Sequence, residues 1–128
     1  MSVRIVRTLE LPWSEIAREF VGDDHGGVSI TFLSVDAEPG RGPSLHRHPY
    51  DEVIIVLEGE ATLDDGIAEH RVAAGDVVVI PSGQPHAFVN SGQELLHQID
   101  INASSHFSTE WLDRAVIEPE DVARDVVR

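Results

Sequence analysis

Closely spaced turn sequences divide this chain into short runs of apolar and β-branched residues, and that division most constrains its fold. Glycine, proline and aspartate mark the boundaries, for example at 64–66, 73–76 and 81–85. Many short strands separated by such turns favour an antiparallel barrel or jelly roll. The sequence therefore predicts an all-β fold, with strands at 28–35, 53–57, 60–63, 67–72, 77–80, 86–89 and 95–101.

The segments on either side of these runs carry different signals. Residues 3–9 alternate apolar residues with arginines, which predicts a first, edge-like strand. Residues 12–20 predict a short helix with Ser14 as its N-cap. Residues 108–112 predict a capped helical turn, and 119–127, with acids early and arginine late, predict a terminal helix.

The length of 128 residues fits one domain. We expect a single domain over residues 1–128, with the barrel core at about 28–102 and a helical tail at about 107–128. No apolar run approaches the roughly 18 residues that cross a bilayer, and the N-terminus lacks the apolar core of a signal peptide. The sequence therefore predicts a cytoplasmic protein.

The composition narrows the chemistry. The chain has no cysteine and no lysine, which excludes disulfides, thiolate ligands and Schiff-base chemistry. Its 23 acidic residues stand against nine arginines, and the formal net charge is −14. Such a surface repels phosphate backbones and anionic headgroups. We expect no nucleic-acid or membrane partner, and a small molecule as the ligand.

Two histidines and a glutamate lie close together between Gly40 and Gly59. His46 and His48 are two residues apart, so both point to one face of an extended strand while Arg47 points the other way. Glu52 follows a short turn and begins the next strand, which places it beside the pair if that strand folds back. Two imidazoles and a carboxylate facing one volume are typical of a divalent metal site.

A second group of fixed residues lies at 75–90. The first group follows the pattern Gly, five residues, His-x-His, three residues, Glu, six residues, Gly. The second follows the pattern Gly, five residues, Pro-x-Gly, two residues, His, three residues, Asn. Pro81 and Gly83 enforce a turn that returns the chain, so the strand carrying His86 can face the same interior as the first pair.

These two patterns resemble the two motifs of the cupin superfamily of small β-barrels. The resemblance implies a double-stranded β-helix, or jelly-roll barrel, in a small single-domain member with short terminal helices. It also implies that the metal ligands are His46, His48, Glu52 and His86. Cupins tend to dimerise, so we expect a homodimer, and an edge strand at residues 3–9 offers one route to it.

Three imidazoles and one carboxylate suit one divalent ion of Fe, Mn, Ni, Co, Zn or Cu. Residues that share faces with the ligands are candidates for the pocket wall. Ile54 and Val56 share the face of Glu52, and Phe88 shares that of His86. Tyr50 lies at the barrel mouth. His97 either lines the cavity or is a satisfied core histidine, because the sequence leaves open which face of 95–101 is interior.

Two classes of function fit this site. The first is a metal-dependent enzyme acting on a small organic molecule, either a dioxygenase or an isomerase or lyase that uses the ion as a Lewis acid. The second is a metal-dependent small-molecule binding protein without turnover. No general base distinct from the ligands is identifiable in the sequence, which keeps the second class open.

Overall fold

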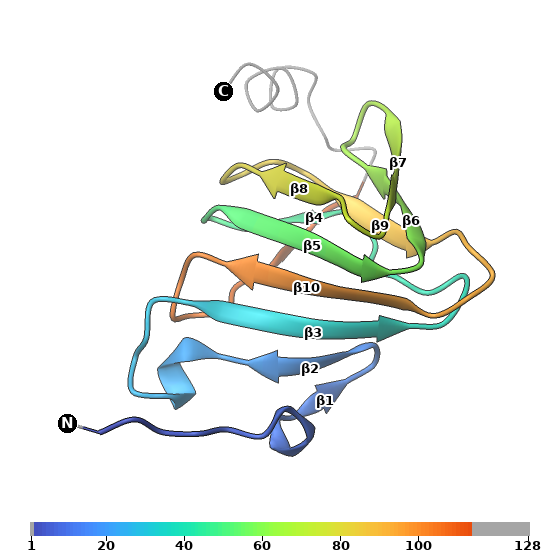
Figure 1. Ribbon diagram of the computed structural model, residues 1–128. Helices are drawn as coiled ribbons and strands as arrows, with labels where there is room; N and C mark the ends of the chain where they lie inside the picture. The colour runs from blue at the N-terminus through green and yellow to red at the C-terminus, as the bar shows by residue number, and fades with distance from the viewer. Residues whose placement is uncertain (1, 114–128) are drawn as a thin grey trace.

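The computed structural model describes residues 2–113, and nearly all of its regular structure is β-strand (Figure 1). The predicted all-β fold is confirmed. In chain order the elements are the 3₁₀ turn η1 (Thr8–Glu10), β1 (Trp13–Ser14), β2 (Ala17–Phe20), the 3₁₀ turn η2 (Gly22–Asp24), β3 (Thr31–Ala37), β4 (His46–Arg47), β5 (Glu52–Glu58), β6 (Glu60–Asp64), β7 (Glu69–Ala73), β8 (Val77–Ile80), β9 (Ala87–Asn90), β10 (Leu96–Asn102) and β11 (Glu110–Trp111).

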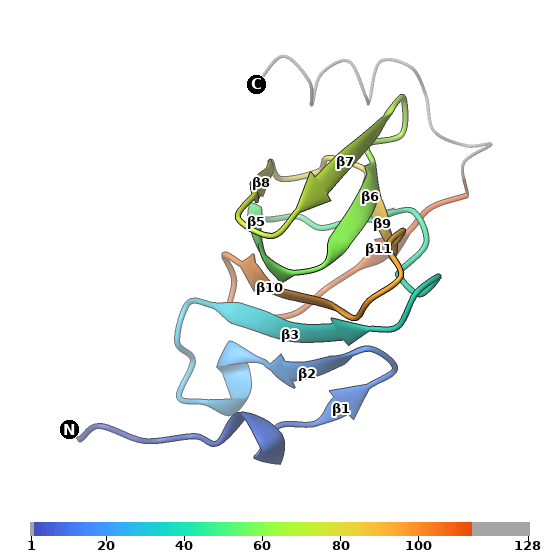
Figure 2. The same ribbon diagram turned by 45° about the vertical axis from the view of Figure 1, so that its right-hand side comes forward.

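The strands form one large and two small antiparallel sheets. The large sheet has the order β1-β2-β3-β10-β5-β8, and the small sheets are β7-β6-β9 and β11-β4. Strand β10 lies between β3 and β5 although both precede it by more than 35 residues in the chain. Figure 2 shows β5 and β8 on one side of the barrel and β6 and β9 on the other.

The apolar core lies between the large sheet and β6 and β9. Its most buried members are Val35, Ala37, Ile54, Val56, Ala61 and Leu96. Two glycines allow the tight reversals around this core. Gly59 joins β5 to β6 with φ of 84°, and a Cβ there would lie 2.6 Å from the Leu95 carbonyl oxygen. Gly83 has φ of 84° in the turn before His86, as the sequence predicts.

The structure differs from the prediction at the N-terminus. Residues 3–9 form no strand: the segment up to η1 is extended without a sheet partner, and Val3 and Ile5 are 90% and 77% exposed. Residues 12–20 form the β1–β2 hairpin instead of a helix. Pairing of β2 with β3 buries Ala17 against Val35, and this tertiary gain outweighs the local helix propensity.

One further prediction is wrong, and one falls outside the described residues. Residues 108–112 contain β11, which pairs with β4, and not a helical turn. Residues 77–80 form the predicted strand, β8, which is an edge of the large sheet and has Val77 and Val79 60% and 70% exposed. The helix predicted at 119–127 lies beyond residue 113.

Candidate metal centre

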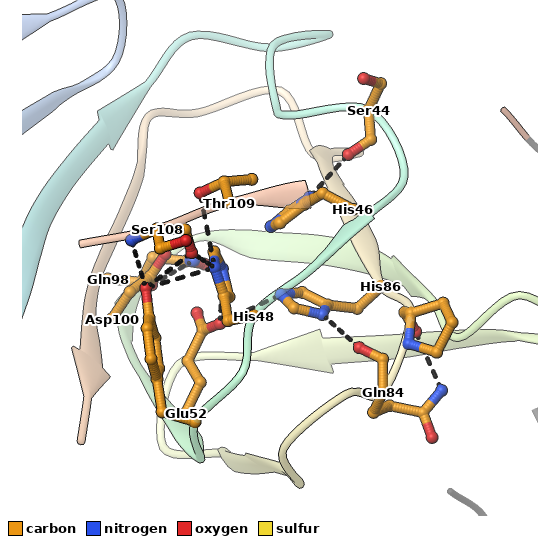
Figure 3. Close-up of polar contacts among 12 residues, drawn as sticks. Ser44, His46, His48, Glu52, Gln84, His86, Gln98, Asp100, Ser108 and Thr109 are labelled. Atoms are coloured by element: carbon orange, nitrogen blue, oxygen red, sulfur yellow. Dashed lines mark hydrogen bonds and ion pairs between the residues drawn. The ribbon is translucent and has the colours of Figure 1, made fainter. Parts of the chain in front are cut away.

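Three histidines from two segments of the chain point toward one another (Figure 3). His46 belongs to β4, His48 follows it, and His86 precedes β9. One ring nitrogen from each lies within 4.8 Å of the other two, and all three side chains are buried. Reciprocal backbone hydrogen bonds of 3.0 and 2.8 Å between His46 and His86 fix the two segments that carry the cluster.

Each histidine is oriented by a backbone carbonyl. The Nδ1 atoms of His46, His48 and His86 lie 2.7, 2.8 and 2.9 Å from the carbonyl oxygens of Ser44, Ser108 and Gln84. A carbonyl oxygen only accepts, so each Nδ1 carries the proton and donates it. The unprotonated Nε2 atom of each ring is therefore the one available to a metal, an arrangement typical of metal-binding histidines.

Glu52 completes the cluster. Its Oε1 lies 3.0 Å from His86 Nε2 and 3.4 Å from His48 Nε2. Glu52 Oε1 and His86 Nε2 are both buried, and neither has a hydrogen-bond partner within residues 2–113. Two lone pairs this close repel each other unless a cation lies between them, and such unpaired buried atoms are unusual. The donor set of three imidazole nitrogens and one carboxylate oxygen therefore fits a divalent metal ion.

Burial keeps the imidazoles of His46 and His48 neutral. Desolvation, followed by the nearby His86, lowers the pKa of His46 to about 4. Desolvation also lowers the pKa of His48, against the opposing effect of its hydrogen bond to Ser108. Neutral imidazoles are the form that binds metals, so these two side chains are ready for a cation at neutral pH without losing protons first.

A cavity of about 700 Å³ opens beside the cluster. His46, His48 and Glu52 reach it from the metal side, while Leu33, Val35 and Phe88 supply an apolar wall. Arg41 and Trp111 also line it. A cavity of this size and mixed lining suits a small organic molecule with one polar and one apolar side.

The inner face of β10 carries polar residues that the sequence left unassigned. Gln98, Asp100 and Asn102 are buried and alternate with the half-buried Ile99 and Ile101, which point outward. Gln98 Nε2 donates a hydrogen bond of 2.7 Å to Asp100 Oδ1. Asp100 and Asn102 line the cavity. The sequence left open which face of this strand is interior, and burial together with the pairing of Asn102 with Glu52 identifies it.

Burial changes the chemistry of Asp100. Desolvation, followed by the charge of Glu52, raises the pKa of this carboxyl well above its usual value, although the hydrogen bond from Gln98 opposes the shift. Asp100 is consequently neutral under conditions where an ordinary aspartate is ionised. A buried neutral acid thus shares a cavity with the histidine cluster.

The structure separates the residues predicted for the pocket wall. Phe88 lines the cavity, whereas Ile54 and Val56 lie in the apolar core and not on the cavity surface. The Tyr50 ring stacks on His48 with centroids 5.2 Å apart, and its hydroxyl donates to the Ser108 carbonyl at 3.0 Å. His97 does not line the cavity: it faces outward, with Nδ1 2.9 Å from Asp36 Oδ1.

The other residues of the two motifs have structural roles. Arg47 points away from the cluster, as predicted, and its guanidinium donates to both carboxylate oxygens of Glu110 at 2.9 and 3.3 Å. Asn90 Nδ2 donates to the carbonyls of Ala37 and Glu94, and its Oδ1 accepts from Gly92. Asn90 therefore ties the end of β9 to its neighbours and takes no part in the metal site.

A family model for the cupin domain matches residues 33–102, which is more than half of the chain. The chain belongs to the cupin family, and its histidine cluster makes it a cupin with the donor set for a metal ion. No helix within residues 2–113 is long and apolar enough to cross a bilayer.

Curated relatives match parts of this chain. Endoribonuclease YbeY of Myxococcus xanthus is 39% identical over 76 residues, which are 59% of this chain and 26% of that protein. Dimethylsulfoniopropionate lyase DddQ of Ruegeria pomeroyi is 46% identical over 44 residues, 34% of this chain and 22% of the lyase. The chain thus spans only about a quarter of the length of either relative.

A solved structure extends the likeness over nearly the whole chain. Oxalate decarboxylase of Bacillus subtilis, a protein with Mn(II) centres, superposes with a TM-score of 0.71 at 26% identity. The match covers 95% of this chain and 36% of the decarboxylase. A single barrel of this kind is therefore found within a larger metalloenzyme.

Proposed function

We propose that this cupin is a metal-dependent enzyme of the lyase or isomerase type that acts on a small organic acid. The observation that carries the proposal is Asp100, a buried carboxyl in the same cavity as the histidine cluster. A desolvated acid beside a metal site is what an enzyme that moves a proton requires.

The proposed ligands are the Nε2 atoms of His46, His48 and His86 together with Oε1 of Glu52. A divalent ion held there supplies Lewis acidity to a bound oxygen of the ligand. The backbone carbonyls of Ser44, Ser108 and Gln84 keep the three rings in place, so little reorganisation accompanies binding. The His-Tyr stack at His48 adds further rigidity.

Asp100 is the proposed proton donor. Gln98 holds one carboxyl oxygen at 2.7 Å, which orients the group toward the cavity that it lines. In its neutral form the carboxyl donates a proton to a leaving group or to a developing negative charge on the ligand. The likeness to dimethylsulfoniopropionate lyase over 44 residues supports the lyase class of the proposal.

The test is a turnover screen of the protein with its metal. Small carboxylic acids, including dimethylsulfoniopropionate, are incubated with the enzyme, and products are followed by NMR while an electrode records oxygen. We expect redox-neutral product formation without oxygen uptake. Asp100→Asn should lower kcat by roughly 10²–10⁴-fold at unchanged metal content, and Asp36→Asn, outside the cavity, should not.

Other outcomes of the screen separate the alternatives. Substrate-dependent oxygen uptake would identify a dioxygenase and contradict the proposal. Tight ligand binding with no product for any acid would favour a binding protein without turnover. A turnover number that Asp100→Asn leaves unchanged would remove Asp100 from the mechanism.

We also propose that the chain forms a homodimer through the outer face of its large sheet. Val79, Val53, Ile101 and Phe32 are aligned across four neighbouring strands, and Val77, Ile55 and Ile99 form a parallel row. These rows carry no charge, so two copies that each bear a net charge of −14 can meet there without bringing acids together. Such an uncharged stripe on an acidic protein suits a second copy of the chain.

Light scattering tests the homodimer. We expect twice the chain mass of 14.0 kDa for the wild type and the monomer mass for Val79→Arg, whose position is open to solvent. A monomeric wild type would contradict the proposal, as would a dimer that Val79→Arg leaves intact.

A further inference from the structure

The last residue of β10 has an unmet hydrogen-bonding requirement. Asn102 is 1% exposed, and neither its Nδ2 nor its Oδ1 has a hydrogen-bond partner among residues 2–113. Asn90, equally buried, uses both of its amide atoms in three hydrogen bonds. Leaving a buried amide unpaired destabilises a fold, so Asn102 is expected to have a partner other than residues 2–113.

The position of Asn102 identifies where that partner comes from. Asn102 lies opposite Glu52 in the sheet on one side and opposite Thr31 on the other. The Thr31 hydroxyl accepts a hydrogen bond from the Gly22 amide at 3.2 Å, and Glu52 Oε1 faces the histidines. Asn102 also lines the cavity, so a molecule in the cavity lies next to its side chain.

We propose that Asn102 recognises a carboxamide or lactam group of the ligand. This inference rests on the proposed function, because the other end of the ligand is then the one held at the metal centre. An amide of the protein with both atoms unpaired is matched by a neutral group that has a donor and an acceptor side by side. Asn102 Nδ2 then donates to the ligand carbonyl while Oδ1 accepts from the ligand N–H.

Other ligand groups fit less well. A carboxylate only accepts and leaves Asn102 Oδ1 unpaired, and it adds a negative charge beside Glu52. An ammonium only donates and leaves Nδ2 unpaired, and a hydrocarbon leaves both atoms unpaired. A bound water satisfies the amide without giving any specificity, which is the competing explanation that the experiment must exclude.

Calorimetry on the metal-loaded protein tests the proposal with paired probes of increasing length. Oxamate, malonamate and succinamate each carry one carboxylate and one carboxamide, and oxalate, malonate and succinate are their dicarboxylate partners. We expect at least one amide probe to bind the wild type about tenfold more tightly than its partner, and Asn102→Leu to abolish that preference. A wild type with no preference, or a preference that Asn102→Leu retains, overturns the proposal.

Thermal unfolding of the ligand-free protein provides a second measurement that needs no ligand. Asn102→Leu removes an unpaired polar group, so we expect an unchanged or higher Tm. Asn90→Leu is the matched control, since it removes three hydrogen bonds and should lower Tm. A Tm that falls equally in both variants would make Asn102 a structural residue and overturn the proposal.

The outcomes distinguish this inference from the proposed function. Binding of the dicarboxylates without amide preference defeats only the role of Asn102. A protein that holds no metal and binds neither series defeats the proposed function, and the inference with it.

Discussion

Strands β5 and β10 are neighbours in the large sheet, yet their sequence patterns relate to the barrel interior in opposite ways. On β5 the inward residues are Glu52, Ile54 and Val56, so the strand is mainly apolar inside after its first residue. On β10 the inward residues are Gln98, Asp100 and Asn102, and the isoleucines face outward. Apolar alternation therefore identifies the inner face only where that face packs into a core.

The reason for the difference is what each strand faces. Ile54 and Val56 pack into the apolar core, where burying hydrocarbon stabilises the fold. Asp100 and Asn102 face a cavity, where polar groups can be kept for a ligand at some loss of stability. Strand β5 therefore contributes mainly to stability, and β10 contributes polar groups to the cavity.

Burial makes the stability of the protein depend on pH in opposite directions at the histidines and at Asp100. Desolvation favours the neutral form of any group, so it lowers the pKa of His46 to about 4 and raises that of Asp100. Lowering the pH should therefore destabilise the metal-free histidine cluster, and raising the pH above about 4 should destabilise the wall that β10 forms. The predictions below test this contrast, from the largest effect to the smallest.

Removing a histidine should have the largest effect. His86→Ala deletes one proposed ligand and leaves Glu52 Oε1 without its neighbour, so we expect metal affinity to fall by more than the roughly 10–100-fold seen when a residue that supports a ligand is changed. Elemental analysis and metal titration measure it. His97→Ala, on the outer face of β10, is the control and should keep the metal. Equal metal content in both variants would show the assignment of ligands to be wrong.

The metal-free protein should lose stability in acid through His46. Its folded-state pKa of about 4 lies below the ordinary 6.5, so the unfolded chain binds the extra proton first as the pH falls. This contribution to the free energy of unfolding is fully present above pH 6.5 and lost between there and pH 4, and it amounts to about 3 kcal/mol. Urea unfolding after metal removal measures it.

One variant controls this measurement. His46→Asn should make the dependence between pH 4 and 6.5 less steep. A profile as steep in His46→Asn as in the wild type would assign the acid sensitivity to other groups.

Asp100 should make the stability of the protein depend on pH in the opposite direction. Its folded-state pKa is raised, so the folded protein holds a proton that the unfolded chain releases above about pH 4, and stability falls as the pH rises. Asp100→Asn keeps the shape and removes this loss, so we expect a Tm a few degrees higher at pH 8 and little difference near pH 4. Calorimetric scans at both values measure it. A stabilisation that is larger at pH 4 would contradict the assigned sign.

The smallest effect concerns the residue between the two histidines. Arg47 and Glu110 form an exposed ion pair that joins β4 to β11, and such pairs contribute about 0.5 kcal/mol or less. Arg47→Ala should therefore change Tm only slightly and leave metal affinity as it is. A large loss of metal would mean that Arg47 takes part in the centre.

The sequence predicts the β-barrel and the convergence of four proposed ligands because both depend on local rules. Turns at Gly59 and Gly83 need positive φ, and His46 and His48 share a face through the period of two. The β1–β2 hairpin and β11 were not predictable in this way, since each is stabilised by pairing with a distant strand. The roles of Asp100 and Asn102 were not predictable for a related reason. Both depend on a cavity whose other wall comes from elsewhere in the chain.

Anomalous diffraction from crystals of the protein with its metal tests the central claim most directly. We predict one strong peak, at the absorption edge of that metal, within bonding distance of the Nε2 atoms of His46, His48 and His86 and of Oε1 of Glu52. The peak should face the cavity that Asp100 and Asn102 line. A metal-loaded crystal with no peak between these four atoms would contradict the account.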